Sequence, residues 1–265
     1  MFLLLGNEAW SLDVVASINP VKQIILAIKQ DVAGEVHLII RSSQSEHNFQ
    51  FKNRDISAIN DADLVFFIDD SLEKNFSKLI KNHSFEQKSF ELSQANGIKL
   101  LQSRANHQKI DPHLWLDPQN SIAIAGFISE KFCEKDAQNC AKYQNNYKQF
   151  SRKINQLEKA IKSDLASLGS DYVIYHDAYQ YFENSFGLKA HKIISYDHHS
   201  NLKIGDIKGL DSAKCLIGEK VDERNSAEKL AKNHHLKFIK VDVLGGEESF
   251  ENLLKNIAAS FAECR

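Results

Sequence analysis

The sequence predicts an α/β protein with two lobes, each a parallel sheet with flanking helices, joined by one long α-helix. Runs with strand character alternate with runs of helical periodicity, which is typical of parallel sheets wrapped by helices. Between two such series, apolar residues repeat at spacings of three and four, which predicts a helix roughly 50 Å long. The expected boundaries are an N-terminal lobe at 1–135, a linking helix at 136–168 and a C-terminal lobe at 169–265.

In the N-terminal lobe, short apolar runs predict strands at residues 12–18, 36–40, 64–68 and 98–101. A helix is expected from Pro20 through Ile28, because proline suits the first turn of a helix. A second helix is expected over residues 72–80. Asp117 and Pro118 are expected to cap and open a third helix that runs through Ile128.

In the C-terminal lobe the alternation resumes after Gly169, which is expected to end the long helix. The predicted strands are residues 172–175, 192–195, 215–217 and 238–241. The predicted helices are residues 178–186, 227–233 and 250–262.

The composition of the chain argues against some classes of function. The chain has 265 residues, 43% of them hydrophobic and 26% charged, with a net charge of -2. This balance argues against nucleic-acid binding, which usually needs a basic stripe. No apolar run approaches the roughly 18 residues of a membrane span. The apolar start, Met1 to Gly6, lacks a basic region and is either the remnant of an export signal or an ordinary disordered start.

The four cysteines fit two disulfides. Cys133 and Cys140 lie close together in the sequence, and Cys215 and Cys264 form a second, more distant pair. One bond would close a small loop and the other would tie the C-terminal helix to the sheet. Four buried thiols are the alternative.

Metal-capable side chains occupy corresponding places in the two halves. His47, His113, His176 and Asp242 follow or precede strand-like runs, and ligands in open α/β sheets bind beyond the carboxyl ends of strands. A metal ion held between the lobes is therefore predicted, and imidazole donors suit zinc, copper and nickel. Asp242 could instead cap a turn before Gly245, with Glu46 or water as the fourth ligand.

Four motifs resemble the periplasmic solute-binding proteins of zinc ABC transporters, the cluster 9 or A-I group. The most specific are Asp111-Pro-His-Leu-Trp-Leu-Asp-Pro118 and Tyr175-His-Asp-Ala-Tyr-Gln-Tyr-Phe182, and the others are Ser45-Glu-His-Asn-Phe49 and Val241-Asp-Val-Leu-Gly245. The resemblance covers nearly the whole chain from Leu12. It implies two Rossmann-like lobes and a zinc site of His47, His113, His176 and Asp242. It also implies a periplasmic protein, expected to be a monomer, that delivers zinc to a membrane permease.

Several sequence features bear on the alternatives to a zinc-delivery function. Manganese and iron members exist in this group, but the manganese type usually carries glutamate where this chain has His176. The His-rich insertion of many zinc members is reduced here to residues 103–110, with His107 as the one histidine. A zinc hydrolase with Glu46 as base is a further alternative, although no HExxH motif or nucleophile elbow is present.

Neighbouring side chains have expected supporting roles. Asp177 is expected either to fix the tautomer of a histidine or to cap the following helix. Trp115 and Tyr179 are expected either to shield the site from water or to pack in the core. Because zinc needs neutral imidazoles, affinity is expected to fall steeply below about pH 6.

Overall fold

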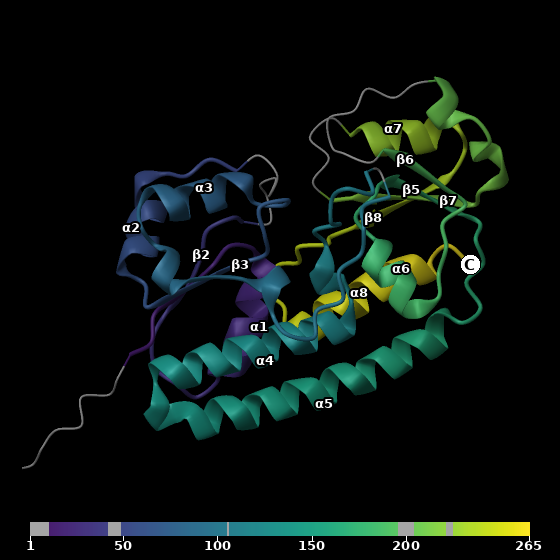
Figure 1. Ribbon diagram of the computed structural model, residues 1–265. Helices are drawn as coiled ribbons and strands as arrows, with labels where there is room; N and C mark the ends of the chain where they lie inside the picture. The colour runs from purple at the N-terminus through teal and green to yellow at the C-terminus, as the bar shows by residue number, and fades with distance from the viewer. Residues whose placement is uncertain (1–10, 42–48, 105, 196–203, 221–224) are drawn as a thin grey trace, which may run out of the picture.

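The computed structural model describes the chain apart from residues 1–10, 42–48, 105, 196–203 and 221–224. The predictions on the apolar start and on Glu46 and His47 therefore lie outside the described residues. Two four-stranded parallel sheets stand side by side above a layer of long helices (Figure 1). The predicted fold class is confirmed.

The N-terminal sheet has the strand order β2-β1-β3-β4. Its strands are β1 (Val14–Ala16), β2 (Val36–Leu38), β3 (Leu64–Phe67) and β4 (Ser89–Glu91). All three pairings are parallel. The central strands β1 and β3 are buried throughout, which explains why their apolar runs were recognisable.

The predicted strand at residues 98–101 is wrong, since the fourth strand of this sheet is β4. The backbone of this segment bonds to side chains of neighbouring helices instead. Lys99 N–H donates to Asn120 Oδ1 (2.7 Å), Asn120 Nδ2 donates to Lys99 O (3.0 Å), and Leu101 N–H donates to the Tyr181 hydroxyl (2.9 Å). These bonds satisfy backbone groups that a strand would have paired in a ladder.

Four helices belong to the first half of the chain: α1 (Asn19–Lys29), α2 (Asn53–Asp61), α3 (Lys74–Asn82) and α4 (Pro118–Lys135). Pro20 lies in the first turn of α1. Asp117 caps α4, because its Oδ1 accepts hydrogen bonds from Gln119 N (2.7 Å) and Asn120 N (3.4 Å). The predicted start of α1 and the predicted cap and start of α4 are confirmed.

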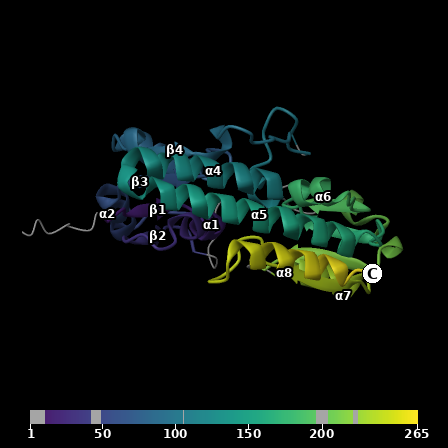
Figure 2. The same cartoon turned by 90° about the horizontal axis from the view of Figure 1, so that it is seen from below.

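The long helix is α5 (Cys140–Leu165), shorter than the predicted 136–168. Helix α4 ends at Lys135, and a short 3-10 turn, η5 (Ala137–Asn139), separates the two helices. The Tyr143 hydroxyl donates to Asp136 Oδ2 (2.8 Å) and so fixes this turn. With 26 residues, α5 is roughly 39 Å long. It runs beside α4 beneath both sheets (Figures 1 and 2).

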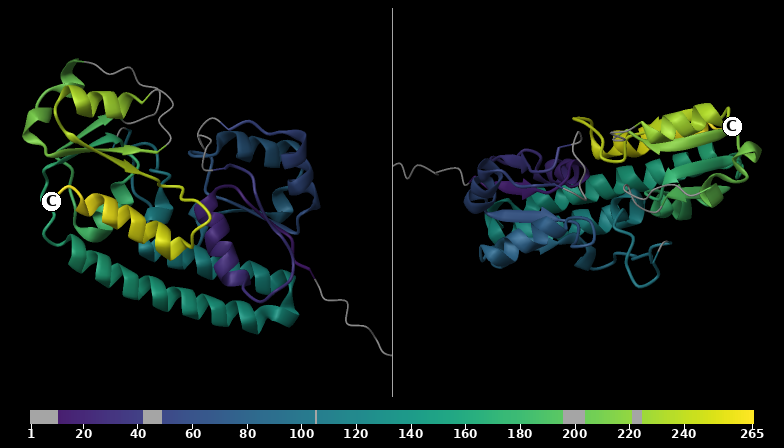
Figure 3. Two further views of the ribbon diagram at one scale, coloured as in Figure 1. Left: turned by 180° about the vertical axis from the view of Figure 1, so that it is seen from behind. Right: turned by 90° about the horizontal axis from the view of Figure 1, so that it is seen from above.

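The C-terminal sheet has the strand order β6-β5-β7-β8. Its strands are β5 (Tyr172–His176), β6 (Lys192–Ser195), β7 (Cys215–Glu219) and β8 (Lys237–Val241). Its helices are α6 (Gln180–Phe186), α7 (Ser226–Asn233) and α8 (Phe250–Ala262). Helix α8 returns along α5 and contacts α1 of the first lobe (Figure 3).

Both disulfides form. Cys133 is bonded to Cys140 at the α4–α5 connection, and Cys215 of β7 is bonded to Cys264 after α8. The second bond ties the C-terminal helix to the sheet as expected. Across the part of the chain that is described, no helix combines the length and apolar character needed to cross a membrane.

Candidate metal centre

His113 is held rigidly by Asp111. The two residues flank Pro112, and Asp111 Oδ1 accepts from the His113 backbone N–H (3.0 Å) and lies 2.8 Å from Nδ1 of its ring. The His113 side chain is buried, with only 2% of the residue exposed. A carboxylate at Nδ1 keeps the proton on that nitrogen, so Nε2 carries the lone pair that a metal needs.

His176 has the same kind of support from another strand. It is the last residue of β5 and 4% exposed. Its Nδ1 lies 2.6 Å from Oε1 of Glu219, the last residue of β7. Because β5 and β7 are neighbouring parallel strands, their carboxyl ends bring the histidine and its carboxylate together. This contact also leaves the lone pair on Nε2, the nitrogen that a metal would need.

The two histidines meet between the lobes. Their ring centroids are 5.8 Å apart, with the rings inclined at 73°. Trp115 packs at 5.4 Å from His113, centroid to centroid, and is fully buried. Its Nε1–H donates to Val243 O (3.0 Å), in the segment that follows β8. Trp115 therefore supports one histidine and the Asp242 segment at once.

Asp242 lies at the end of β8 with both carboxylate oxygens engaged. Oδ1 accepts from the backbone N–H groups of Leu244 (3.2 Å) and Gly245 (2.8 Å), and Oδ2 accepts from Lys220 Nζ (2.9 Å). The turn before Gly245 is thus capped as the alternative hypothesis expected. Among the described residues, no three His, Cys, Asp or Glu side chains gather closely enough to hold a metal. A ligand role for Asp242 stays a prediction, as it does for His47 and Glu46.

The loop after Asp242 is fixed to the first lobe. Asn19, the first residue of α1, donates through Nδ2 to the carbonyl oxygens of Leu244 (3.0 Å) and Gly246 (2.5 Å). Together with the Trp115 bond to Val243, these contacts join both lobes at the loop. The position of the loop is therefore set by tertiary contacts.

Tyr179 lies three residues after His176 in the chain. It is fully buried, and its hydroxyl has no hydrogen-bond partner among the residues that the structure describes. Burial raises the pKa of Tyr179 well above its ordinary value, and the charges of Glu219 and Asp242 add to the rise.

Asp177 has a different partner from the one expected. Arg104 Nε lies 3.0 Å from each Asp177 carboxylate oxygen, and Arg104 Nη1 lies 2.7 Å from Glu183 Oε2. Glu183 Oε1 also accepts from the Tyr172 hydroxyl (2.8 Å). The expectation that Asp177 fixes a histidine tautomer is corrected, because Glu219 occupies that place at His176. Arg104 ties the segment before His113 to the start of α6.

Sequence reasoning missed the supporting carboxylates Asp111 and Glu219. Both carried a usable signal. Asp111 stands two residues before His113, a spacing that lets a side chain bond back to the turn. Glu219 closes the apolar run of β7, so the rule that polar groups converge at carboxyl ends of parallel strands applies to it as well.

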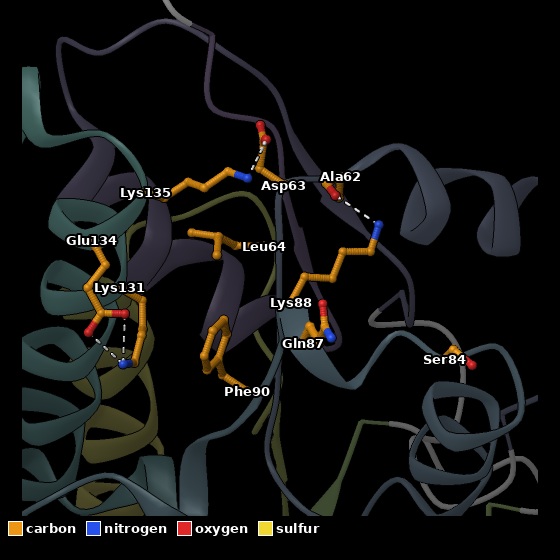
Figure 4. Close-up of a pocket in the computed structure, with 10 residues that line it drawn as sticks. All are labelled: Ala62, Asp63, Leu64, Ser84, Gln87, Lys88, Phe90, Lys131, Glu134 and Lys135. Atoms are coloured by element: carbon orange, nitrogen blue, oxygen red, sulfur yellow. Dashed lines mark hydrogen bonds and ion pairs between the residues drawn. The ribbon is translucent and has the colours of Figure 1, made fainter.

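The structure also has a hollow that is not lined by His113 or His176. It has a volume of about 450 Å³ and forms where β3 begins and α4 ends (Figure 4). Its lysines already have partners: Lys88 with Ala62 O (3.0 Å), Lys131 with Glu134 (2.7 Å) and Lys135 with Asp63 (3.4 Å). None of the described residues that line it is a histidine, and it is not the predicted metal site.

Two parallel α/β lobes on a helical layer, with supported histidines between them, define the class of bilobal metal-binding solute-binding proteins. A family model described as zinc-uptake complex component A, periplasmic, matches residues 14–264. The chain belongs to this family. It is a substrate-binding protein of the zinc-uptake type, in a family that works with ABC transporters in the periplasm.

Individual relatives support this assignment. The high-affinity zinc uptake system protein ZnuA of Brucella abortus (strain 2308) is 26% identical over 304 residues, covering 95% of this chain and 91% of that protein. A manganese ABC transporter substrate-binding lipoprotein, PsaA of Streptococcus mitis, is 29% identical over 177 residues, covering 62% of this chain and 57% of its own length. Relatives named for zinc and for manganese therefore both occur.

Solved structures agree on the fold. A crystal structure of ZnuA superposes with a TM-score of 0.85 at 22% identity, covering 96% of this chain and 99% of that chain. A zinc-bound deletion mutant of ZnuA gives a TM-score of 0.84 at 20% identity, covering 96% and 98%. A manganese-bound periplasmic protein from candidatus liberibacter asiaticus gives 0.81 at 18% identity, covering 96% and 99%. At these identities the likeness concerns the fold.

Proposed function

We propose that this chain binds one zinc ion between its lobes, in preference to manganese, and delivers it as a monomer to a membrane permease. The observation that carries the proposal is the buried pair of His113 and His176, each with a carboxylate at Nδ1 (2.8 and 2.6 Å). This arrangement presents two neutral nitrogen donors from different segments toward one region. Nitrogen donors favour zinc, whereas manganese favours oxygen-rich sites.

The ligand set that we propose is His47, His113, His176 and Asp242. Three imidazoles and one carboxylate satisfy the tetrahedral preference of zinc. His113 and His176 support this set through their burial and their contact with each other. Glu46 or water is the alternative to Asp242, which already has other partners.

Binding rather than catalysis follows from the family role. In this function zinc is the cargo, so the site must hold the ion and later release it to the permease. Loops tied across the lobes by Asn19 and Trp115 favour a site that is largely formed before zinc arrives. The lobes then need only small movements, since the rigid helix α5 lies beneath both of them.

A competition titration tests this function. The protein is stripped with a chelator and titrated with zinc against manganese, as wild type and as His113→Ala and His176→Ala. One zinc ion per chain, preference over manganese and a loss of affinity of orders of magnitude in both variants are expected. His191→Ala is the matched control, because His191 is exposed and contacts the Ser212 hydroxyl (2.9 Å).

Other results would contradict the proposal in different ways. A preference for manganese would move the chain to the manganese-binding members of its class. Zinc binding that is indifferent to His113 and His176 would place the site elsewhere. Turnover of generic ester or phosphate substrates by the zinc-loaded protein would favour the hydrolase alternative.

A further inference from the structure

Lys220 and Asp242 form an ion pair at the carboxyl ends of two neighbouring strands. Lys220 follows the last residue of β7 and Asp242 follows the last residue of β8. Beyond the paired residues Glu219 and Val241, Lys220 N–H donates to Val241 O (2.8 Å), so the parallel ladder continues as far as this pair. The Nζ–Oδ2 distance is 2.9 Å. The backbone itself therefore places the ammonium beside the carboxylate.

The two oxygens of Asp242 have different partners. Oδ1 is bound by the backbone N–H groups of Leu244 and Gly245, which belong to a loop anchored on the first lobe by Asn19. Oδ2 is bound by Lys220. A metal ion that binds Asp242 through Oδ2 must displace Lys220 from that oxygen. Oδ1 can meanwhile keep its hydrogen bonds to the turn.

The ion pair lies next to the residues that support His176. Glu219 Oε1 contacts His176 Nδ1 at 2.6 Å, and Lys220 is the next residue in the chain. Asp242 follows Val241, the register partner of Glu219 across β7 and β8. The ion pair is therefore adjacent to the carboxylate that supports His176.

We infer that Lys220 is a competing counter-ion of the zinc site. It holds Oδ2 of Asp242 until zinc arrives, and zinc binds Asp242 only when this ion pair opens. Lys220 therefore lowers the affinity for zinc and gives the carboxylate a partner to return to when the ion leaves. The inference rests on the proposed function, and it assigns to Lys220 a role in setting affinity and release.

The expected effect of Lys220 on zinc affinity follows from the solvent exposure of the Lys220 and Asp242 side chains. The Lys220 side chain is 58% exposed and that of Asp242 is 23% exposed. Exposed ion pairs are weak, because water screens the charges and the lysine side chain loses freedom when it is held. Removing Lys220 is therefore expected to tighten zinc binding by roughly two- to fivefold. A change of this size eases release without abolishing capture.

The test measures zinc affinity by chelator competition for wild type, Lys220→Gln and Lys220→Arg. Lys220→Gln is expected to bind zinc roughly two- to fivefold more tightly, and Lys220→Arg, which keeps the ion pair, is expected to match wild type. Lys240→Gln is the control, since Lys240 is an exposed lysine on β8 and its removal changes the net charge equally. It should leave the affinity unchanged.

A double-mutant cycle separates competition for Asp242 from a general charge effect. In an Asp242→Asn background, Lys220→Gln should no longer tighten zinc binding, because the carboxylate for which the ion competes is gone. An equal gain in that background would mean that Lys220 merely repels the cation, and the inference would be overturned. Unchanged or weaker binding by Lys220→Gln in the wild-type background would overturn it as well.

Failure of the proposed function gives a different result in the same titration. If wild type itself binds no zinc, the proposed function is wrong. Lys220 then has no zinc ion with which to compete for Asp242. If wild type binds zinc through His113 and His176 but Lys220→Gln equals wild type, only the role of Lys220 is lost. Circular dichroism melts of each variant check that the substitutions leave the fold intact.

Discussion

Glu219 Oε1 lies 2.6 Å from His176 Nδ1 and joins the carboxyl ends of β7 and β5. The same relationship recurs at His113, whose Nδ1 lies 2.8 Å from Asp111 Oδ1. Each carboxylate fixes the tautomer and the orientation of one imidazole. The two predicted histidine ligands that the structure describes are therefore oriented by the protein before any metal binds.

Replacing Glu219 by glutamine should weaken zinc binding by about tenfold. The amide can still accept the Nδ1 proton, but it lacks the negative charge that makes the imidazole a better donor, and such outer partners typically contribute ten- to a hundredfold in affinity. Chelator competition measures the change. Glu263→Gln removes a carboxylate from an exposed pair with Lys237 and should leave affinity unaltered. Equal affinities for Glu219→Gln and wild type would refute the supporting role.

Zinc affinity should fall steeply between pH 7.5 and pH 5.5. Zinc binds only neutral imidazole, and an ordinary imidazole takes up its proton near pH 6.5, so protons compete with the metal as the pH falls. The loss can reach about tenfold per pH unit for each imidazole that protonates. Titrations across this range measure it, with circular dichroism at each pH to exclude unfolding. A flat profile would contradict a site built from histidines.

The sequence predicted best those elements whose signal is local. Asp117 and Pro118 marked the start of α4 because a cap acts within a few residues. Helix α8 was predicted with its observed ends, since its apolar face repeats regularly and Ser249 caps it. The alternation of strands and helices was sufficient to predict two parallel sheets, although the fourth strand of the first sheet was misplaced.

The predictions from sequence failed where contacts between residues far apart in the chain determine the local structure. Residues 98–101 carry strand-like side chains, but Asn120 and Tyr181 satisfy their backbone. The position of Glu219 at a strand end indicated the site but not its partner, because the pairing of β5 with β7 brings it to His176. The ion pair between Lys220 and Asp242 likewise depends on the β7–β8 register. Such contacts depend on topology, which single-residue patterns do not contain.

The two disulfides should differ in what they contribute to stability. Cys215 and Cys264 are separated by 49 positions, whereas Cys133 and Cys140 are separated by 7. A longer loop loses more conformational freedom in the unfolded chain, which predicts a loss of about 4 kcal/mol for a Cys215→Ser, Cys264→Ser variant and of about 2 kcal/mol for Cys133→Ser, Cys140→Ser. Urea unfolding of the oxidised proteins measures both. Equal losses would show that native-state contacts outweigh loop length.

Glu73 should make the stability of the protein depend on pH. Only 2% of this residue is exposed, and its Oε2 accepts from Ile68 N–H (2.7 Å). Burial raises the pKa of Glu73 from 4.5 to about 8; the charge of Asp69 adds to the rise, while the hydrogen bond from Ile68 N–H opposes it. Between these two values the folded protein keeps a proton that the unfolded chain has lost. The stabilisation is complete below pH 4.5 and disappears as the pH rises through 8.

Glu73→Gln removes this dependence, because the amide stays neutral and can still accept from Ile68 N–H. The free energy of unfolding of wild type, relative to Glu73→Gln, should therefore decrease between pH 5 and pH 8 by a few kcal/mol, at most about 1.4 kcal/mol per pH unit. Urea unfolding of both proteins at the two pH values measures the difference. Glu86→Gln, at an exposed carboxylate, should keep the wild-type profile. If wild type and Glu73→Gln change in parallel with pH, Glu73 is ionised in the folded protein and its burial does not control stability.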